Sequence, residues 1–337
     1  MTNHRRLAVA EIEALAKDVL VAAGARPENA EPLARAIAEA ERDGIASHGL
    51  MYLPVYVEHL RCGKVDGRAE PVLDRPRPGV VRVDAATGFA HPAIERGLDP
   101  LLEVARNQGI GCLSIHNSYN CGVLGHHAER IAVAGLVGLC FTNAPASIAP
   151  VGGSRPVIGT NPFALAVPDG QGAAALVIDQ SASVVAKSEV VKRARAGQPI
   201  PEGWALDAEG APTTDPNAGL KGSMTPSGGY KGVGLGLMVE VFAAALAGAE
   251  LGIDAAPFSG TAGGPPRTGQ FFIAVDPLPS SGGLFTQKIA RLADAIADQE
   301  GARLPGGRRL DARTRARTEG VPVDRALLEE IEALRAA

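Results

Sequence analysis

The first sixty residues carry hydrophobic side chains at helical spacing. Between residues 8 and 23 the apolar positions repeat every three or four residues, and Gly24 ends the pattern. A second helix is predicted from Pro27 to Glu41, with Gly44 beyond its end, and a third over residues 53–60. These segments predict a small helical domain covering residues 1–75.

After residue 76 the pattern changes to short apolar runs bounded by Gly, Pro, Asn and Asp, which is typical of β-strands. Runs of this kind lie within residues 80–88, 109–118, 135–144, 161–169, 174–183 and 270–277. Helical spacing returns in residues 124–134, 230–250, 285–300 and 323–337. Strands mixed with helices predict an α/β core over residues 76–309, with the helices of residues 310–337 joining the N-terminal helical domain. Two segments rich in Gly and Pro, 197–219 and 254–268, are expected to be loops that border a cleft.

Composition and charge narrow the class of protein. The 337 residues are 46% hydrophobic and 21% charged, which is ordinary for a globular protein. A net charge of −4 and 4% aromatic residues argue against nucleic acid or an anionic membrane as partner. We find no signal peptide pattern and no apolar run of membrane-spanning length, so a cytoplasmic location is expected.

The cysteines and histidines do not suggest a metal site. Cys62, Cys112, Cys121 and Cys140 have no C-x-x-C spacing and are interpreted as reduced thiols. His126 and His127 are adjacent, but neighbours on a helix point about 100° apart and do not easily share one ion. No metal is expected.

The segment "ASHGLMYLP", residues 46–54, raises the first chemical question. It places Ser47 beside His48 at the end of the second predicted helix. One interpretation is structural, because a histidine near a helix C-terminus interacts favourably with the helix dipole. The other is functional, with His48 as a proton donor whose properties are set by its neighbour.

Common nucleotide and hydrolase motifs are absent: the sequence has no G-x-G-x-x-G after a strand, no Walker loop and no G-x-S-x-G. Polar, glycine-flanked segments remain instead. "HNSYNCGVLG", residues 116–125, joins a predicted strand to a helix, where backbone amides can hold a phosphate. Asp179 ends a strand, Lys231 precedes a glycine-rich helix, and "RLPGGRR", residues 303–309, carries three arginines suited to phosphate. Each has a structural explanation as well, as an ordinary loop, a helix cap or a solvated basic segment.

Four motifs occur in a specific order: "RDGIASHG", "GTNPFALAVP", "SGGYKGVGLGLMVE" and "RLPGGRR". Together they resemble the malate/L-lactate dehydrogenase-like oxidoreductases, over nearly the whole chain from about residue 8. The resemblance implies the sulfolactate dehydrogenase fold, a non-Rossmann α/β fold with a mixed sheet and an N-terminal helical domain. "RLPGGRR" and "PPRTGQFFIAVDP" are most similar to the branch of Δ1-piperideine-2-carboxylate/Δ1-pyrroline-2-carboxylate reductases.

The resemblance also implies roles for residues at matching positions. His48 resembles the proton donor and Ser47 the residue that orients it. Substrate contacts would fall on Tyr52, Thr160, Lys187 and Ser188. Dinucleotide contacts would fall on Asn120, Cys121, Gly122, Val123, Leu124, Asp179, Gln180, Ser181, Tyr230, Lys231, Arg303, Leu304, Pro305, Gly306, Gly307, Arg308 and Arg309.

Two motifs depart from the family pattern. S-H-G-x-x-R ends here in Tyr52 instead of arginine, and N-S-x-H-F-G has Asn120 and Cys121 in place of histidine and phenylalanine. The expected function is NAD(P)H-dependent reduction of a cyclic 2-imino acid, with a 2-oxo or 2-hydroxy acid as the alternative. A family member that binds the dinucleotide without catalysis is the alternative of another class. NADPH is expected over NADH because of the three arginines, and a homodimer is expected.

Overall fold

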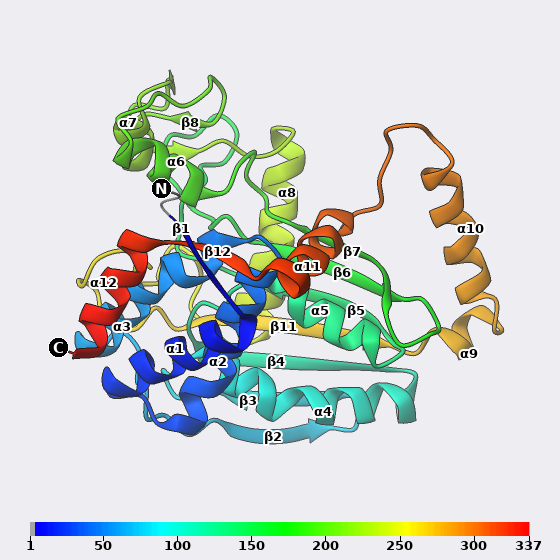
Figure 1. Ribbon diagram of the computed structural model, residues 1–337. Coiled ribbons are helices and arrows are strands. Elements are labelled where there is room, and N and C mark those ends of the chain that lie inside the picture. Colours follow the sequence, from blue (N-terminus) through cyan, green and yellow to red (C-terminus); the bar gives the residue numbers. More distant parts are fainter. Residues whose placement is uncertain (1–3, 337) are drawn as a thin grey trace.

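The computed structural model describes residues 4–336 and contains a central sheet with helices on both faces (Figure 1). The helices are α1 (Val9–Ala22), α2 (Pro27–Arg42), α3 (Leu53–Arg61), α4 (Ala90–Gln108), α5 (Leu124–Val133), α6 (Lys187–Arg195), α7 (Pro216–Lys221), α8 (Tyr230–Val239), α9 (Pro277–Ser281), α10 (Phe285–Ala297), α11 (Gly307–Glu319) and α12 (Arg325–Ala336). Short 3-10 turns η1 (Ala46–His48) and η2 (Leu50–Tyr52) follow α2, and a π-helical segment, η3 (Glu240–Leu246), continues α8.

The strands form three sheets. They are β1 (His4–Leu7), β2 (Val72–Arg77), β3 (Val80–Asp84), β4 (Ile110–Ser118), β5 (Val137–Thr142), β6 (Phe163–Pro168), β7 (Ala174–Gln180), β8 (Ala205–Leu206), β9 (Pro212–Thr213), β10 (Ser223–Met224), β11 (Thr268–Val275) and β12 (Val321–Asp324). Seven of them form the central sheet in the order β2-β3-β4-β11-β5-β6-β7. β3 and β4 run parallel through the α4 crossover, and the other neighbouring pairs are antiparallel.

The two faces of the sheet are covered by different helices. In β11, Phe272 and Ala274 belong to the cluster that α4 and α5 cover, whereas Phe271 and Ile273 pack with α8 and η3 on the other face. This alternation follows from the two-residue period of a strand. The sheet therefore holds the β4–α5 connection and the end of β7 against a buried, rigid core.

The N-terminal helices pack with the C-terminal segment. Their cluster of buried residues joins α1, α2 and α3 to Ala316, Val321, Val323, Leu328 and Ile331. β1 and β12 form an antiparallel pair that the sequence pattern did not reveal, with Leu7 opposite Val321. This packing supports the proposed division into a helical domain and an α/β domain. The central sheet begins at Val72, slightly before the expected boundary.

Several elements differ from the pattern-based expectation. The helix expected over residues 323–337 begins at Arg325, because β12 occupies the preceding residues. The segment 197–219, expected to be a loop, contains β8, β9 and part of α7, which belong to a small lobe (Figure 1). Long α4 was not anticipated, and its Pro100 masks the helical pattern. Among residues 4–336, none of the helices combines the length and apolar character that a membrane crossing requires.

Candidate active site

The Ser47–His48 pair lies in η1, immediately after α2 ends. Gly44 adopts φ +73°, and the amide of Ile45 donates to the carbonyl of Ala40 at 2.8 Å, which turns the chain out of the helix. The Ser47 hydroxyl and His48 Nδ1 are 3.1 Å apart. Burial lowers the pKa of His48, and nearby Asp179 opposes this effect. The half-buried imidazole is therefore oriented through Nδ1.

Buried Glu41 fixes the chain just after His48. Its Oε1 accepts from the amide of Leu50 at 2.7 Å, and burial raises the pKa of this carboxyl. A Cβ on Gly49 would collide with the Glu41 carboxylate. The glycine of the S-H-G motif is thus required by a close approach to α2, and this contact holds His48 in place.

A buried charge network anchors the end of α2 to α5 and α11. The guanidinium of Arg313 forms bidentate contacts with Asp43 (2.8 and 2.6 Å) and with Glu129 (both 2.6 Å). His126 contacts the same Asp43 carboxylate at 3.0 Å. Burial alone would raise the pKa of Asp43, but hydrogen bonds from Arg313, His126 and Arg42 hold it well below its usual value. The network fixes the helix end that carries His48.

Asp179 and Arg309 form the second part of the site. Their side chains pair at 2.8 Å, and Asp179 Oδ2 also accepts from the amide of Gly125 at 2.9 Å, in the first turn of α5. A Cβ on Gly125 would lie 2.6 Å from Arg309 Nη1 and 2.7 Å from Asp179 Oδ2, so only glycine fits. Arg309 Nη1 is buried and has no hydrogen-bond partner within residues 4–336. Burial is the main cause of the lowered pKa of His48, and the charges of Asp179 and Arg309 act on it in opposite directions.

The loop between β4 and α5 carries Asn120, Cys121, Gly122 and Val123, and leads into Leu124. Asn120 Oδ1 accepts from the amide of Gly122 at 2.6 Å, and Gly122 adopts φ +68°. The side chain of Asn120 also interacts with the hydroxyl of Tyr52. Tyr52 and Asn120, which both depart from the family pattern, are therefore neighbours in the folded chain. His127, in contrast to His126, points to the carbonyl of Cys121 at 2.9 Å, which supports this loop.

A further group of predicted residues gathers beyond the end of β7. Gln180 ends the strand, Ser181 contacts Ser183 at 3.1 Å, and the amide of Ala182 donates to the carbonyl of Thr160 at 2.8 Å. The amide of Ser227, three residues before Tyr230, donates to the carbonyl of Ala182 at 2.8 Å. The start of α8, with Tyr230 and Lys231, is thus tied to the end of β7.

Lys187 and Ser188 begin α6 in the small lobe. Lys187 is exposed overall, yet desolvation around its ammonium lowers its pKa. Its position at a helix N-terminus also disfavours the charged form. Neither residue has a direct contact to His48, so the structure does not by itself join them to the Ser47–His48 pair.

The arginine segment is divided between a loop and a helix. The carbonyl of Pro305 accepts from the amide of Val177 at 3.3 Å, which places Leu304, Pro305 and Gly306 along β7. Gly307 begins α11, and Arg308 and Arg309 lie in its first turn. Arg303 and Arg308 are exposed, whereas Arg309 is engaged with Asp179. The three guanidinium groups therefore have different environments.

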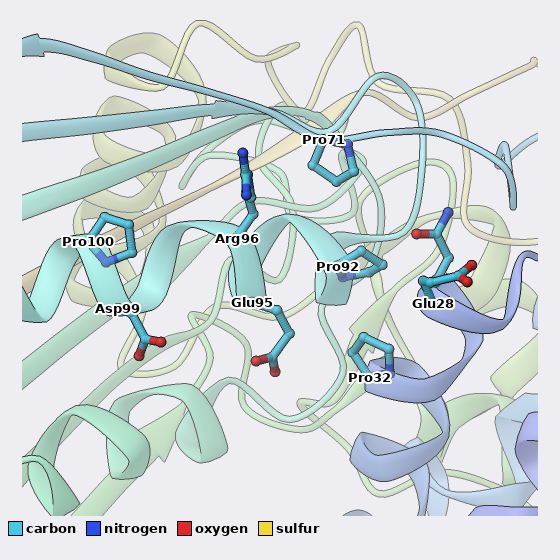
Figure 2. A pocket seen from close by; sticks show the side chains of 9 residues that line it. Glu28, Pro32, Pro71, Pro92, Glu95, Arg96, Asp99 and Pro100 are labelled. Carbon is cyan, nitrogen blue, oxygen red and sulfur yellow. The ribbon is translucent and has the colours of Figure 1, made fainter.

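An open groove between α2 and α4 is a separate feature (Figure 2). It is lined by prolines such as Pro32 and Pro92 together with the carboxylates of Glu28, Glu95 and Asp99. It lies toward the N-terminal half of α2, about 15 Å before the helix end at Arg42 when counted from Pro32 at 1.5 Å per residue, and His48 follows that end. None of the predicted site residues lines this groove.

Sequence reasoning missed the residues that support the site. Asp43, Arg313 and Gly125 act through contacts between elements far apart in the chain. One signal was present: Arg309 and Arg313 are four residues apart on α11, which places them on one helix face. Buried Asn161 was also missed, although its side chain holds Glu240 at 2.8 Å and the carbonyl of Gly236 at 2.9 Å, beside Thr160.

The fold and this site define an oxidoreductase, and comparison with known proteins identifies its family. The family model described as malate/L-lactate dehydrogenase matches residues 7–332, and the chain belongs to that family. The chain is 45% identical to the (2R)-3-sulfolactate dehydrogenase (NADP(+)) of Chromohalobacter salexigens, covering 98% of both chains. It is 42% identical to the Delta(1)-pyrroline-2-carboxylate reductase of Ancylobacter novellus, covering 98% of this chain and 97% of that protein.

A solved structure shows the same fold. The delta1-piperideine-2-carboxylate reductase from Pseudomonas syringae superposes with a TM-score of 0.93 at 36% identity, covering 98% of this chain and 99% of the other. The predicted non-Rossmann, sulfolactate dehydrogenase-like fold and the predicted family are therefore confirmed.

Proposed function

We propose that this protein reduces a cyclic 2-imino acid of the Δ1-pyrroline-2-carboxylate or Δ1-piperideine-2-carboxylate type with NADPH, and that His48 supplies the proton. Relatives named as reductases of these compounds, 36–42% identical to this chain, support the substrate class. The observation that carries the proposal is the position of His48. It is oriented by Ser47, and its pKa, which burial lowers, also responds to the charges of Asp179 and Arg309 in the region where the dinucleotide contacts are expected.

The residues of this region fit a dinucleotide. Gly125 lets the Asp179–Arg309 pair approach the first turn of α5, and the buried Nη1 of Arg309 lacks a partner within residues 4–336. The N-terminus of α5, with the amides that follow Asn120, offers donors suited to an anion. Residues 120–124, 179–181, 230–231 and 303–309 would hold the cofactor. A bound nicotinamide supplies the hydride that the imine carbon accepts.

The protein's contribution to the reaction is the proton and its placement. Hydride addition to an imine leaves negative charge on nitrogen, and an acid with a pKa near the working pH is needed to neutralise it. The Ser47 hydroxyl holds Nδ1 of His48, so Nε2 is the atom that delivers the proton. Lys187 and Tyr52 are proposed to contact the substrate in place of the family arginine, and Thr160 and Ser188 to line the same region.

NADPH is proposed over NADH because exposed Arg303 and Arg308 are free to meet a 2′-phosphate. Arg309 is the weaker candidate, since Asp179 already balances its charge. The measurement is the dissociation constant of each dinucleotide from its fluorescence. Equal or tighter binding of NADH would show that these arginines serve another part of the cofactor.

An alternative substrate class has its own support. The relative with 45% identity is named a sulfolactate dehydrogenase, which favours a 2-hydroxy or 2-oxo acid. A third possibility is that the protein binds the dinucleotide without catalysis. The departures from the family pattern at Tyr52 and Asn120 are the reason to consider it. Consumption of NADPH on a panel of imino and oxo acids separates these three possibilities.

The decisive variant is His48→Ala. We expect turnover on the preferred imino acid to fall on the order of a hundredfold or more, with the dissociation constant of NADPH unchanged. His4→Ala is the control, because His4 lies on β1 and makes none of the contacts of the site. Near-normal turnover in His48→Ala would refute its role as proton donor.

We also propose a homodimer. Leu237, Met238, Val241 and Leu246 are 38–58% exposed along α8 and η3, which is an apolar surface that a second copy would cover. Light scattering at micromolar concentration gives the mass directly, and a monomer would contradict the proposal. A cytoplasmic location is consistent with the four free cysteines in the described chain.

A further inference from the structure

Two buried side chains hold the backbone of the β4–α5 loop, residues 119–123, from the protein interior. Gln270, on β11, donates from Nε2 to the carbonyl of Tyr119 at 3.1 Å. His127, on α5, has its Nε2 2.9 Å from the carbonyl of Cys121. Gln270 is fully buried and His127 is nearly so. Two carbonyls of the loop, two residues apart, are therefore bound by side chains from two different elements.

Both side chains act on the loop as donors, because a carbonyl oxygen only accepts. The atom of Gln270 that faces Tyr119 is therefore the amide nitrogen, and its Oε1 is buried with no hydrogen-bond partner within residues 4–336. Burial lowers the pKa of His127 to about 4, so the ring is neutral at pH 7 and carries its one proton on Nε2.

The two contacts set the direction of the loop amides. In a trans peptide unit the C=O of one residue and the N–H of the next point in opposite directions, and residues 4–336 contain no cis peptide bond. Because the carbonyls of Tyr119 and Cys121 face the buried side chains, the amides of Asn120 and Gly122 point away from them. The amide of Gly122 accordingly meets an oxygen of a partly exposed side chain, Asn120 Oδ1, at 2.6 Å.

The end of the loop adjoins groups that are suited to an anion. The loop leads directly into the N-terminus of α5, which carries partial positive charge. The guanidinium of Arg309 lies beside the first turn of this helix, since a Cβ on Gly125 would be 2.6 Å from its Nη1. This Nη1 is buried and has no hydrogen-bond partner in the described chain. The helix terminus and the unpaired donor both favour a phosphate group at this place.

Loss of the His127 donor would allow the loop to reverse. A buried carbonyl without a donor is unfavourable, so the carbonyl of Cys121 would turn toward water. Gly122 permits this rotation, because it already adopts φ +68° and glycine tolerates both signs of φ. The amide of Gly122 would then turn inward. The reversed loop presents an oxygen where an anion needs a donor, and binding has to restore the original orientation.

We propose that His127 and Gln270 are positioning residues for the dinucleotide, and that they hold the β4–α5 loop with its amides directed toward an anionic group of the cofactor. This inference rests on the proposed function and adds two buried residues that do not touch the cofactor themselves. Their contribution is preorganisation, because the loop amides are oriented before the ligand arrives.

The test compares His127→Asn with His127→Gln. The side-chain nitrogen of glutamine reaches about as far as Nε2 of histidine, whereas that of asparagine is shorter and matches Nδ1. We measure the dissociation constant of NADPH by fluorescence and that of inorganic pyrophosphate by calorimetry. His127→Asn should raise both constants about tenfold, whereas His127→Gln should stay within about twofold of wild type, because it keeps the donor. The comparison separates the donor to the loop from the loss of the imidazole.

Gln270→Met tests the second contact, and His91→Leu is the control. Gln270→Met removes the donor to Tyr119 but keeps much of the side-chain volume, and should raise both dissociation constants about threefold or more. The buried His91 ring lies 5.9 Å from that of His127, and neither of its nitrogens has a hydrogen-bond partner within residues 4–336. His91→Leu should therefore leave both constants within about twofold of wild type.

Steady-state kinetics distinguish positioning from a general structural role. In His127→Asn, KM for NADPH should rise, whereas kcat and KM for Δ1-piperideine-2-carboxylate at saturating NADPH should remain near wild type. A general structural role would change kcat and both KM values together, and that result would overturn the inference. If His127→Asn does not fold, the same measurements on Gln270→Met decide.

Unchanged dissociation constants in His127→Asn and Gln270→Met would also overturn the inference, as would an equal rise in His127→Gln or His91→Leu. The proposed function can fail separately. If wild type binds NADPH but reduces neither imino nor oxo acids, the dissociation constants of the variants still decide whether His127 and Gln270 position the loop. Wild type that binds none of NADPH, NADH and pyrophosphate would overturn both proposals.

Discussion

Arg313 is expected to be the most important single residue for the stability of the predicted active site. Its guanidinium joins α11 to Asp43 at the end of α2 and to Glu129 on α5, through four short hydrogen bonds. Arg313→Met removes the cation but keeps much of the side-chain volume. Two carboxylates then remain in a largely buried position, and the Asp43 side chain is fully buried.

The size of the effect follows from this burial. Removing one partner of a buried ion pair costs about 3–5 kcal/mol, because the remaining charge is left uncompensated. Asp43 keeps contacts to Arg42 at 2.8 Å and to His126 at 3.0 Å, which favours the lower end of that range. We therefore expect the free energy of unfolding to fall by about 3 kcal/mol. Exposed Arg75, paired with Glu103, is the matched control, and Arg75→Met should cost less than about 1 kcal/mol.

Urea denaturation at pH 7 measures the difference, and its pH dependence identifies the cause. The folded-state pKa of Asp43 is held well below the unfolded value of about 3.9. The stability that this shift contributes is fully present above the unfolded pKa and is lost as pH falls below it. The difference in free energy of unfolding between wild type and Arg313→Met should therefore be constant near neutral pH. It should become smaller from about pH 5 downward.

Two results would refute this reasoning. If Arg313→Met lowers the free energy of unfolding by less than about 1 kcal/mol, Arg313 is no more important than an exposed cation. If the difference in unfolding free energy from wild type stays constant down to pH 3, the carboxylates of Asp43 and Glu129 do not cause it. Arg313→Met should also lower turnover, because Asp43 lies five residues before His48. If Arg313→Met is destabilised but fully active, the charge network around Arg313 supports stability and does not affect catalysis.

Three further expectations concern the site and the assembly. Gly125→Ala should weaken NADPH binding about tenfold or more by displacing the Asp179–Arg309 pair, measured by fluorescence titration, whereas Gly79→Ala, where a Cβ meets nothing within 4 Å, should not change binding. Tyr52→Arg combined with Asn120→His should raise kcat/KM on simple 2-oxo and 2-imino acids by about tenfold or more, since a charge-assisted contact contributes about 1.5–3 kcal/mol; an unchanged value would show that both departures are neutral. Leu237→Asp should yield a monomer by light scattering, because a charge cannot be buried unpaired at a dimer contact, and a dimeric variant would exclude this face.

Much of the fold follows from local pattern. The helices α1, α2 and α3 have apolar spacing and glycine stops that are read directly from the chain, and they occur where expected. The strands of the central sheet other than β2 are likewise apolar runs between turn residues. β1 and β12 were missed because each has only four residues, and their pairing depends on the chain ends meeting. α4 was missed because Pro92 and Pro100 interrupt its pattern.

The sequence by itself indicated which segments are candidates for the chemistry. Ser47–His48, the residues from Asn120 to Leu124, Asp179 and the arginine segment were all identified from residue type, glycine spacing and family resemblance. The tertiary structure decided how these groups interact. It paired Arg309 with Asp179, left Arg303 and Arg308 exposed, and tied the end of β7 to the start of α8. The physical reason is that charge pairing and hydrogen-bond direction depend on distances between segments far apart in the chain. Local sequence specifies a donor or an acceptor, but only the folded chain determines which partner it meets.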